Sequence, residues 1–189
     1  MNEIKIIEDV ENWLNQSVLP NIKLKKPLSA QDFEMEQPKA YSMYLPNKEM
    51  INSFYDYPYP SVLVQFKNST DYLKAHTGEV EILLHIAVWN PGKHRPEMGK
   101  QEAASPGLNY LRSPDGWKDA TIVAEKIKEQ LSAEGSINGH RILFERGLRT
   151  YPYAENNAII DFYPFFFMEM EFSIENAFAT TPKPYQKYL

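Results

Sequence analysis

The chain has 189 residues, of which 43% are hydrophobic and 13% aromatic, a composition that predicts one ordered domain with extensions. Lysine and arginine number 20, aspartate and glutamate 25, and the formal net charge is −5, so we do not expect sequence-specific binding of nucleic acid. The absence of cysteine excludes disulfides, thiolate catalysis and cysteine-bound zinc. Charged residues interrupt the first segment, and no apolar run reaches membrane-spanning length, so we expect no membrane partner and a cytoplasmic protein when it is made.

The first 60 residues predict a helix followed by an extended arm. Apolar residues recur at spacings of three and four in residues 1–19, which is typical of an amphipathic helix. Pro20 should end this helix, because proline lacks the amide that would continue the ladder. Prolines punctuate residues 20–60, and only residues 40–45 have the pattern of a strand. We expect the arm to wrap around a core or a neighbouring subunit, with its own subunit favoured because aromatic residues are buried within a domain first.

The predicted core covers residues 61–175. Residues 61–67 and 79–90 predict an antiparallel hairpin joined by a polar turn, and the even positions of the second strand form one apolar face. The next connection, residues 91–114, is long and rich in proline and charge, and connections of this kind are usually functional or disordered.

A helix is predicted for residues 116–133, with Asp115 as its N-cap and Gly135 at its end. Residues 139–145 predict a further short strand. Residues 176–189 contain prolines among small and polar residues and predict a tail without a core.

The last predicted strand, residues 160–174, is the one around which the rest of the predicted fold is arranged. Its even positions are apolar, and its odd positions change from aromatic to polar along the strand. The even face should therefore be buried along its whole length, and the odd face covered near its start and wet near its end. We expect helix 116–133 to cover the aromatic half, and Pro164 to mark a bulge or an unpaired edge position.

Together these segments predict a single α+β domain. A mainly antiparallel sheet is built from four strands, at residues 61–67, 79–90, 139–145 and 160–174. Helix 116–133 packs on one face of this sheet, and the N-terminal helix and the extended arm complete residues 1–189.

No catalytic, cofactor or metal site is predicted. The four histidines lie in different predicted elements, none at the spacing of a helical metal site: His76, His85, His94 and His140. Glu169 and Glu171 share a strand face, but alternating glutamates are expected from solubility alone, so their replacement by glutamine should leave function largely intact. No nucleophile elbow, phosphate loop or dinucleotide fingerprint is present. The sequence predicts a protein that is not an enzyme.

Four pieces of the chain carry a resemblance: AYSMYLPNKE, YPYPSVLVQFKN, SPDGWKDATIVAEKIKEQL and TYPYAENNAIIDFYPFFFMEMEFSI. They contain a YP-led strand, a D-G-aromatic-x-D start to a helix, and a YPY turn before a last aromatic strand. In this order they resemble the tail terminator, or tail completion, family of tailed phages and prophages of Gram-positive bacteria. The match covers roughly residues 40–175, and none of its motifs is catalytic.

The resemblance implies a virion structural protein whose copies form a ring, commonly a hexamer. Such a ring caps the tail tube and joins it to the head connector, so the implied partners are other copies, the tail tube protein and the head connector protein. The implied location is the host cytoplasm during assembly and then the virion tail. Another neck or head-tail joining component, and a monomeric ligand-binding α+β domain, are the alternatives.

We expect the long loop of residues 91–114, the aromatic arm of residues 21–59 and the tail to make the contacts of this ring, because all three are too long for simple connections. Their apolar side chains need a surface, and five of them are the predicted interface residues: Met98, Tyr110, Leu111, Tyr185 and Tyr188.

Overall fold

The computed structural model describes residues 3–29, 32–45, 58–73, 76–94, 110–111, 113–155, 158–159 and 162–177. Its centre is a five-stranded sheet with the strand order β10-β13-β5-β4-β3. The bounds of these strands are β3 (Lys39–Ser42), β4 (Ser61–Tyr72), β5 (Thr77–Trp89), β10 (Arg149–Pro152) and β13 (Phe165–Ala177). All neighbours are antiparallel except β3 and β4. The predicted α+β class is confirmed.

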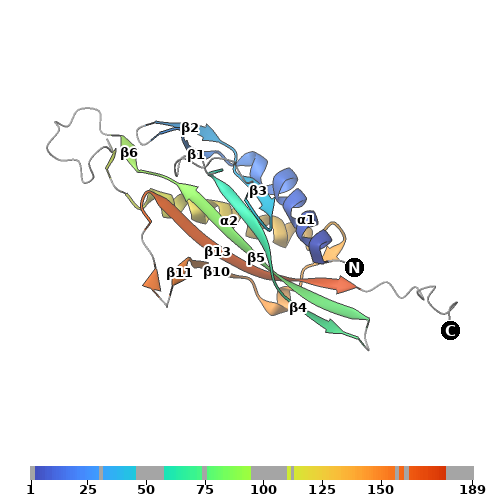
Figure 1. Cartoon of the computed structure of the whole chain (residues 1–189). Coiled ribbons are helices and arrows are strands. Elements are labelled where there is room, and N and C mark those ends of the chain that lie inside the picture. The colour runs from blue at the N-terminus through green and yellow to red at the C-terminus, as the bar shows by residue number, and fades with distance from the viewer. Residues whose placement is uncertain are drawn as a thin grey trace, which may run out of the picture.

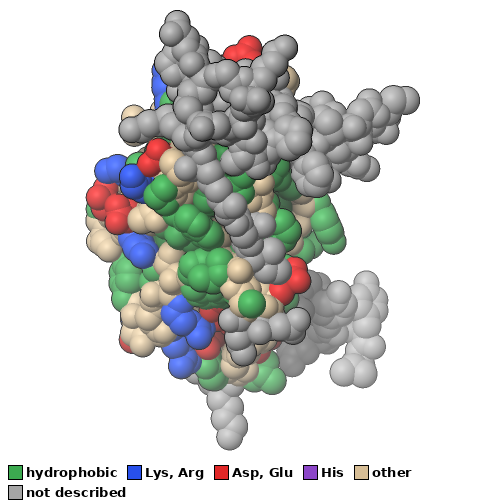
Figure 2. All heavy atoms as spheres, turned by 90° about the vertical axis from the view of Figure 1, so that its left-hand side faces the viewer, with side chains coloured by type: hydrophobic (Ala, Val, Ile, Leu, Met, Phe, Trp, Pro, Cys, Tyr) green, Lys and Arg blue, Asp and Glu red, His purple; other side chains and the backbone are tan. Residues whose placement is uncertain are grey.

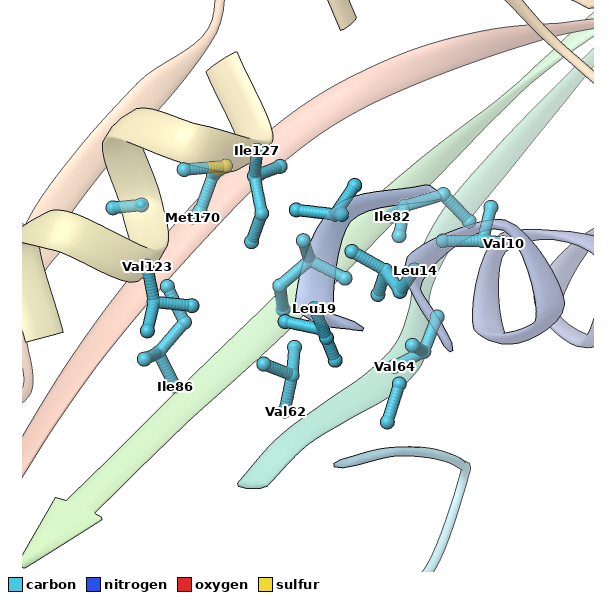
Figure 3. Close-up of a cluster of buried hydrophobic side chains, with 14 of the residues drawn as sticks. Val10, Leu14, Leu19, Val62, Val64, Ile82, Ile86, Val123, Ile127 and Met170 are labelled. Atoms are coloured by element: carbon cyan, nitrogen blue, oxygen red, sulfur yellow. The ribbon is translucent and has the colours of Figure 1, made fainter. Parts of the chain in front are cut away.

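Both long helices cover one face of this sheet (Figure 1). Helix α2 (Asp115–Glu134) contacts β5 and β13, whereas α1 (Glu3–Trp13) contacts β3 and β4. The even positions of the two long central strands point toward the helices, and Ile82, Leu84 and Met170 are completely buried. Figure 3 shows this core, in which side chains from both helices meet those of β4, β5 and β13. The predicted shared buried side is confirmed.

The N-terminal helix ends before Pro20, as predicted, but its last turn is not α-helical. After Trp13 the chain continues as a π-helical turn, η1 (Leu14–Val18), and a 3₁₀ turn, η2 (Leu19–Asn21). Pro20 lies in the first positions of η2, where its missing N–H costs no hydrogen bond. Leu14 and Leu19 are buried, so burial of these side chains accompanies the extra turns.

The segment predicted as an extended arm contains more structure than expected. A hairpin of β1 (Leu24–Pro27) and β2 (Phe33–Glu36) precedes β3. The ring of Phe33 lies 6.4 Å from that of Trp89, so the hairpin packs on the end of β5. Strand β3 confirms the predicted strand near residue 40, and β1, β2 and β3 pack on their own chain.

The outer edge of β3 is closed by a side chain of η1. The amide of Asn15 donates to the carbonyl of Ala40 (3.1 Å) and accepts the N–H of Ala40 (2.9 Å). Ala40 is completely buried. The amide therefore replaces the two backbone hydrogen bonds that a neighbouring strand would make.

We expect Asn15→Leu to lower the free energy of unfolding by about 1–3 kcal/mol, because it leaves the buried N–H and C=O of Ala40 without partners. Urea unfolding measures this loss. Gln16→Leu, at the adjacent and more exposed position, is the control and should change stability by less than about 0.5 kcal/mol. Equal losses in the two variants would contradict this role of Asn15.

The predicted strand at residues 139–145 is wrong. Its first part pairs locally, as β8 (Ser136–Ile137) with β9 (His140–Arg141), and its last part is a 3₁₀ turn, η4 (Phe144–Arg146). Asn138 and Gly139 both have positive φ, which fits the tight turn between β8 and β9. Residues 142 and 143 bond to the backbone of β13 without forming a strand, and β10 takes the predicted place in the sheet.

Strand and helix ends also differ from the prediction. The β4–β5 hairpin includes most of the predicted polar turn. Strand β13 begins directly after Pro164, so Phe162 precedes it and is 42% exposed, and the even face is not buried along its whole predicted length. Pro114, not Asp115, occupies the N-cap of α2, and Asp115 pairs with Lys118 at 2.8 Å. Gly135 ends the helix at φ 67°, as predicted.

Two further pairs of two-residue strands lie outside the central sheet. Strands β6 (Lys93–His94) and β7 (Tyr110–Leu111) join the two ends of the long loop. Strands β11 (Ala154–Glu155) and β12 (Ala158–Ile159) form a small ladder between β10 and β13 in the sequence.

Candidate functional site

The candidate site is the uncovered face of the sheet, by which we mean the face opposite α1 and α2 that carries the odd positions of β5 and β13. It has two regions. The aromatic cluster consists of Tyr59, Tyr153, Phe162, Phe165 and Phe167. The ionic cluster consists of Lys67, Glu79, Glu81, Arg146, Arg149, Tyr151 and Glu171.

The aromatic cluster lies where β13 begins. The ring centroids of Tyr59 and Phe165 are 5.0 Å apart, and Phe162 meets Phe167 edge-on at 5.5 Å. Such edge-on pairs stabilise a cluster beyond the area that they bury. Figure 2 views this end of the molecule and shows hydrophobic side chains gathered near its middle. Phe162 is 42% exposed and the other four rings are half-buried, so the rings cover one another only in part.

Helix α2 does not cover these rings, so the predicted cover is wrong. The helix lies on the even face, where the ring of Trp117 meets Phe166 edge-on at 5.4 Å. The alternation of side chains in the sequence separates the two faces of β13. Because both faces begin with aromatic residues, the pattern does not decide which of them the helix covers.

Glu171 is the centre of the ionic cluster. Its carboxylate accepts hydrogen bonds from Lys67 Nζ at 2.5 Å and from the hydroxyl of Tyr151, and it lies 3.1 Å from the guanidinium of Arg149. Burial alone would raise the pKa of Glu171, but the hydrogen bonds from Lys67 and Tyr151 outweigh it, and the pKa is lowered. Burial and the bond to Glu171 raise the pKa of Tyr151.

The prediction that this end of the odd face is wet is wrong for Glu171, which is only 4% exposed. Solubility therefore does not account for this glutamate. Its partners come from β4 and β10, which lie on opposite sides of the β13–β5 pair in the sheet. The carboxylate ties these strands together across the uncovered face.

The charges of the ionic cluster balance. Arg146 meets Glu79 at 2.8 Å, and Glu81 accepts from Lys67 at 3.4 Å and from Arg149 at 3.2 Å. Three carboxylates thus pair with three cations, and all of these charged side chains except Lys67 line a hollow of about 150 Å³. Because every charge in the cluster has a partner, the arrangement suits cohesion of the sheet better than capture of a charged ligand.

His85 forms a smaller polar group between the two clusters. Its Nδ1 lies 3.0 Å from a carboxylate oxygen of Glu169, and its Nε2 lies 2.9 Å from the amide oxygen of Gln65. Both ring nitrogens thus have partners, and neither partner is a nucleophile. Within the described parts of the chain, no group of three or more histidine, aspartate or glutamate side chains could hold a metal ion.

A second polar group holds the base of the long loop. The ammonium of Lys25 donates to the side-chain oxygen of Asn90 at 2.8 Å and to the carbonyl of Gly92 at 2.9 Å. The amide of Asn90 donates to Asp119 of α2 at 2.6 Å. Burial lowers the pKa of Lys25 and raises that of Asp119. Sequence reasoning missed this group because its members come from three separate elements.

Of the five predicted interface residues, the structure describes only Tyr110 and Leu111. Met98, Tyr185 and Tyr188 lie outside the described residues. Tyr110 and Leu111 form β7, opposite β6, and only their backbone is described. Their role in an interface stays a prediction.

The fold and the site define a class, an α+β protein whose sheet has one face covered by helices and one face that no described helix covers. No protein-family model matches the chain, and no curated protein matches it in sequence. Across the described ranges, none of the helices is long and apolar enough to cross a bilayer.

Proposed function

We propose that this protein is a phage or prophage tail terminator, whose copies form a ring that caps the tail tube and joins it to the head connector. The main observation in favour of this proposal concerns the four motifs that resemble the tail terminator family. In their order along the chain, they fall on elements that build or cover one sheet. The first begins in β3, the second leads into β4, the third forms α2, and the fourth runs from β10 into β13.

The helix-start motif has a physical reason in this fold. Gly116 lies against the ring of Phe166, where a β-carbon would come within 2.0 Å of Cδ2. Trp117 packs edge-on against the same ring, and Asp119 accepts the hydrogen bond from Asn90. The motif therefore sets the distance between α2 and the sheet, and this supports a shared fold.

The uncovered face supports assembly. Partly exposed aromatic rings on a surface that no described helix covers are typical of a contact between proteins. The neighbouring ionic cluster stiffens the same face, because it links β4, β10 and β13. A rigid surface loses less conformational entropy when a partner binds.

Solution size with and without the tube protein tests the proposal. Light scattering after size-exclusion chromatography should give a ring at high concentration, or on addition of the tail tube protein from the same phage or prophage. Phe162→Ser should weaken assembly by at least about tenfold if this exposed ring lies in the contact. Ile122→Ser, on the exposed side of α2, is the matched control, since that side chain is 44% exposed.

A chain that stays monomeric in both conditions and does not bind tube ends would overturn the proposal in favour of a monomeric binding domain. Binding to the head connector but never to tube ends would instead assign it to another neck component.

A further inference from the structure

A groove of about 830 Å³ includes Tyr59, a member of the aromatic cluster, in its lining. It is lined by residues of β1, β2 and β3, of η1 and η2 and of the segment before β4. Its wall is part polar and part apolar, and four prolines and two tyrosines make the apolar part stiff: Pro20, Pro38, Pro58, Pro60, Tyr41 and Tyr59. Grooves of this kind bind extended segments, because flat rings and fixed prolines offer surface without losing rotamer freedom.

The charge of the groove is opposite to that of the whole chain. Three lysines and one carboxylate line it, Lys23, Lys26, Lys39 and Glu36, whereas the protein carries −5 overall. Lys26 is satisfied by Glu34 at 3.2 Å and by Glu36 at 2.5 Å. For Lys23 and Lys39, the described residues provide no carboxylate within 4 Å, and the ammonium of Lys39 lies over the ring of Tyr41 at 5.6 Å. Counting Glu34 as well, the groove keeps an excess positive charge.

We propose that this groove binds an acidic, proline-containing extended segment of a partner protein. Carboxylates of the segment pair with Lys23 and Lys39, and its prolines pack on Tyr41 and Tyr59. The tail of this chain does not suit the groove, since residues 178–189 contain two lysines and no acidic side chain. The inference does not depend on the tail terminator proposal.

Fluorescence anisotropy with a defined probe tests the groove. The probe is a rhodamine-labelled decapeptide, Glu-Pro-Glu-Pro-Tyr-Glu-Pro-Glu-Pro-Glu, titrated with the full chain, and the control peptide has lysine at every glutamate. Saturable binding of the acidic peptide alone is expected. The double variant Lys23→Glu, Lys39→Glu should weaken it by about tenfold or more, which corresponds to about 1.4 kcal/mol.

The control variant is Lys118→Glu, Lys126→Glu, which makes the same change of net charge on the exposed side of α2. It should change the affinity by less than about twofold, because neither lysine lines the groove and exposed charges are screened by salt. Circular dichroism checks that each variant is folded.

Equal weakening by the two double variants, or no saturable binding of the acidic probe, would overturn the proposal. A synthetic peptide of residues 46–57, which precede Pro58 and carry a net charge of −1, is the competitor. If it binds more tightly than the probe, the occupant is the chain itself and not a partner.

Discussion

Glu171→Gln should lower the free energy of unfolding by roughly 2 kcal/mol, the usual value of hydrogen bonds to a buried charged group. The variant keeps the shape of the side chain but removes the negative charge between Lys67, Arg149 and Tyr151. The two cations keep their contacts with Glu81, which limits the loss. Urea unfolding at neutral pH measures it.

Glu169→Gln is the matched control, two positions away on the same face. Its carboxylate contacts His85 and is more exposed, so the loss should be well under 1 kcal/mol. Equal losses of stability in the two variants would show that Glu171 does not stabilise the sheet more than Glu169 does. Solubility alone would then explain both glutamates, as the sequence suggested.

The same carboxylate should make stability depend on pH. Its pKa is lower in the folded protein than the ordinary value of 4.5, so its contribution is fully present above that value. The contribution is lost as pH falls through the lower pKa of the folded state. The difference in stability between the natural chain and Glu171→Gln should therefore shrink between about pH 5 and pH 2.5. A difference that stays constant over this range would contradict the role of the charge.

Gly116→Ala should destabilise the protein by about 1–3 kcal/mol, although alanine normally favours a helix over glycine. The added methyl group would lie 2.0 Å from Cδ2 of Phe166, whose side chain is only 6% exposed and is packed against Trp117. Overpacking at this point pushes α2 away from β13. Thermal and urea unfolding measure the loss.

A double variant separates this collision from other effects. Phe166→Leu removes the ring that the new methyl group meets, so Gly116→Ala should cost at least about 1 kcal/mol less in that background. A cost that is unchanged by Phe166→Leu would show that the glycine is needed for another reason.

The predictions from sequence succeeded where burial of one side of a helix or strand makes apolar residues recur at a regular spacing. β13 and β5 each have more than ten residues with one side always buried, and α2 carries an apolar stripe, so the pattern is long enough to read. Short elements give no such signal. The β1–β2 hairpin has four residues in each strand, and Lys25 is a charged residue whose ammonium is held inside by Asn90.

The candidate site was harder to predict than the fold. Lys67, Glu171 and Arg149 are far apart in the sequence, and only the order of the strands brings them together. The alternation of glutamates on β13 has a simple explanation in solubility, and nothing in the sequence distinguishes Glu171, which is buried, from Glu169, which is less so. Pairing and burial of single charges depend on the tertiary structure, which a periodicity does not contain.

The contact of Asn15 with Ala40 has a consequence for how copies of the chain can join. A bare strand at the margin of a sheet can recruit the same strand of another molecule, and repetition of that step leads to an open-ended fibre. Here the amide already occupies both hydrogen-bonding groups of Ala40. At this position a second copy would have to make contact through side chains, and in the proposed ring such contacts at a fixed angle would allow identical subunits to close after a set number.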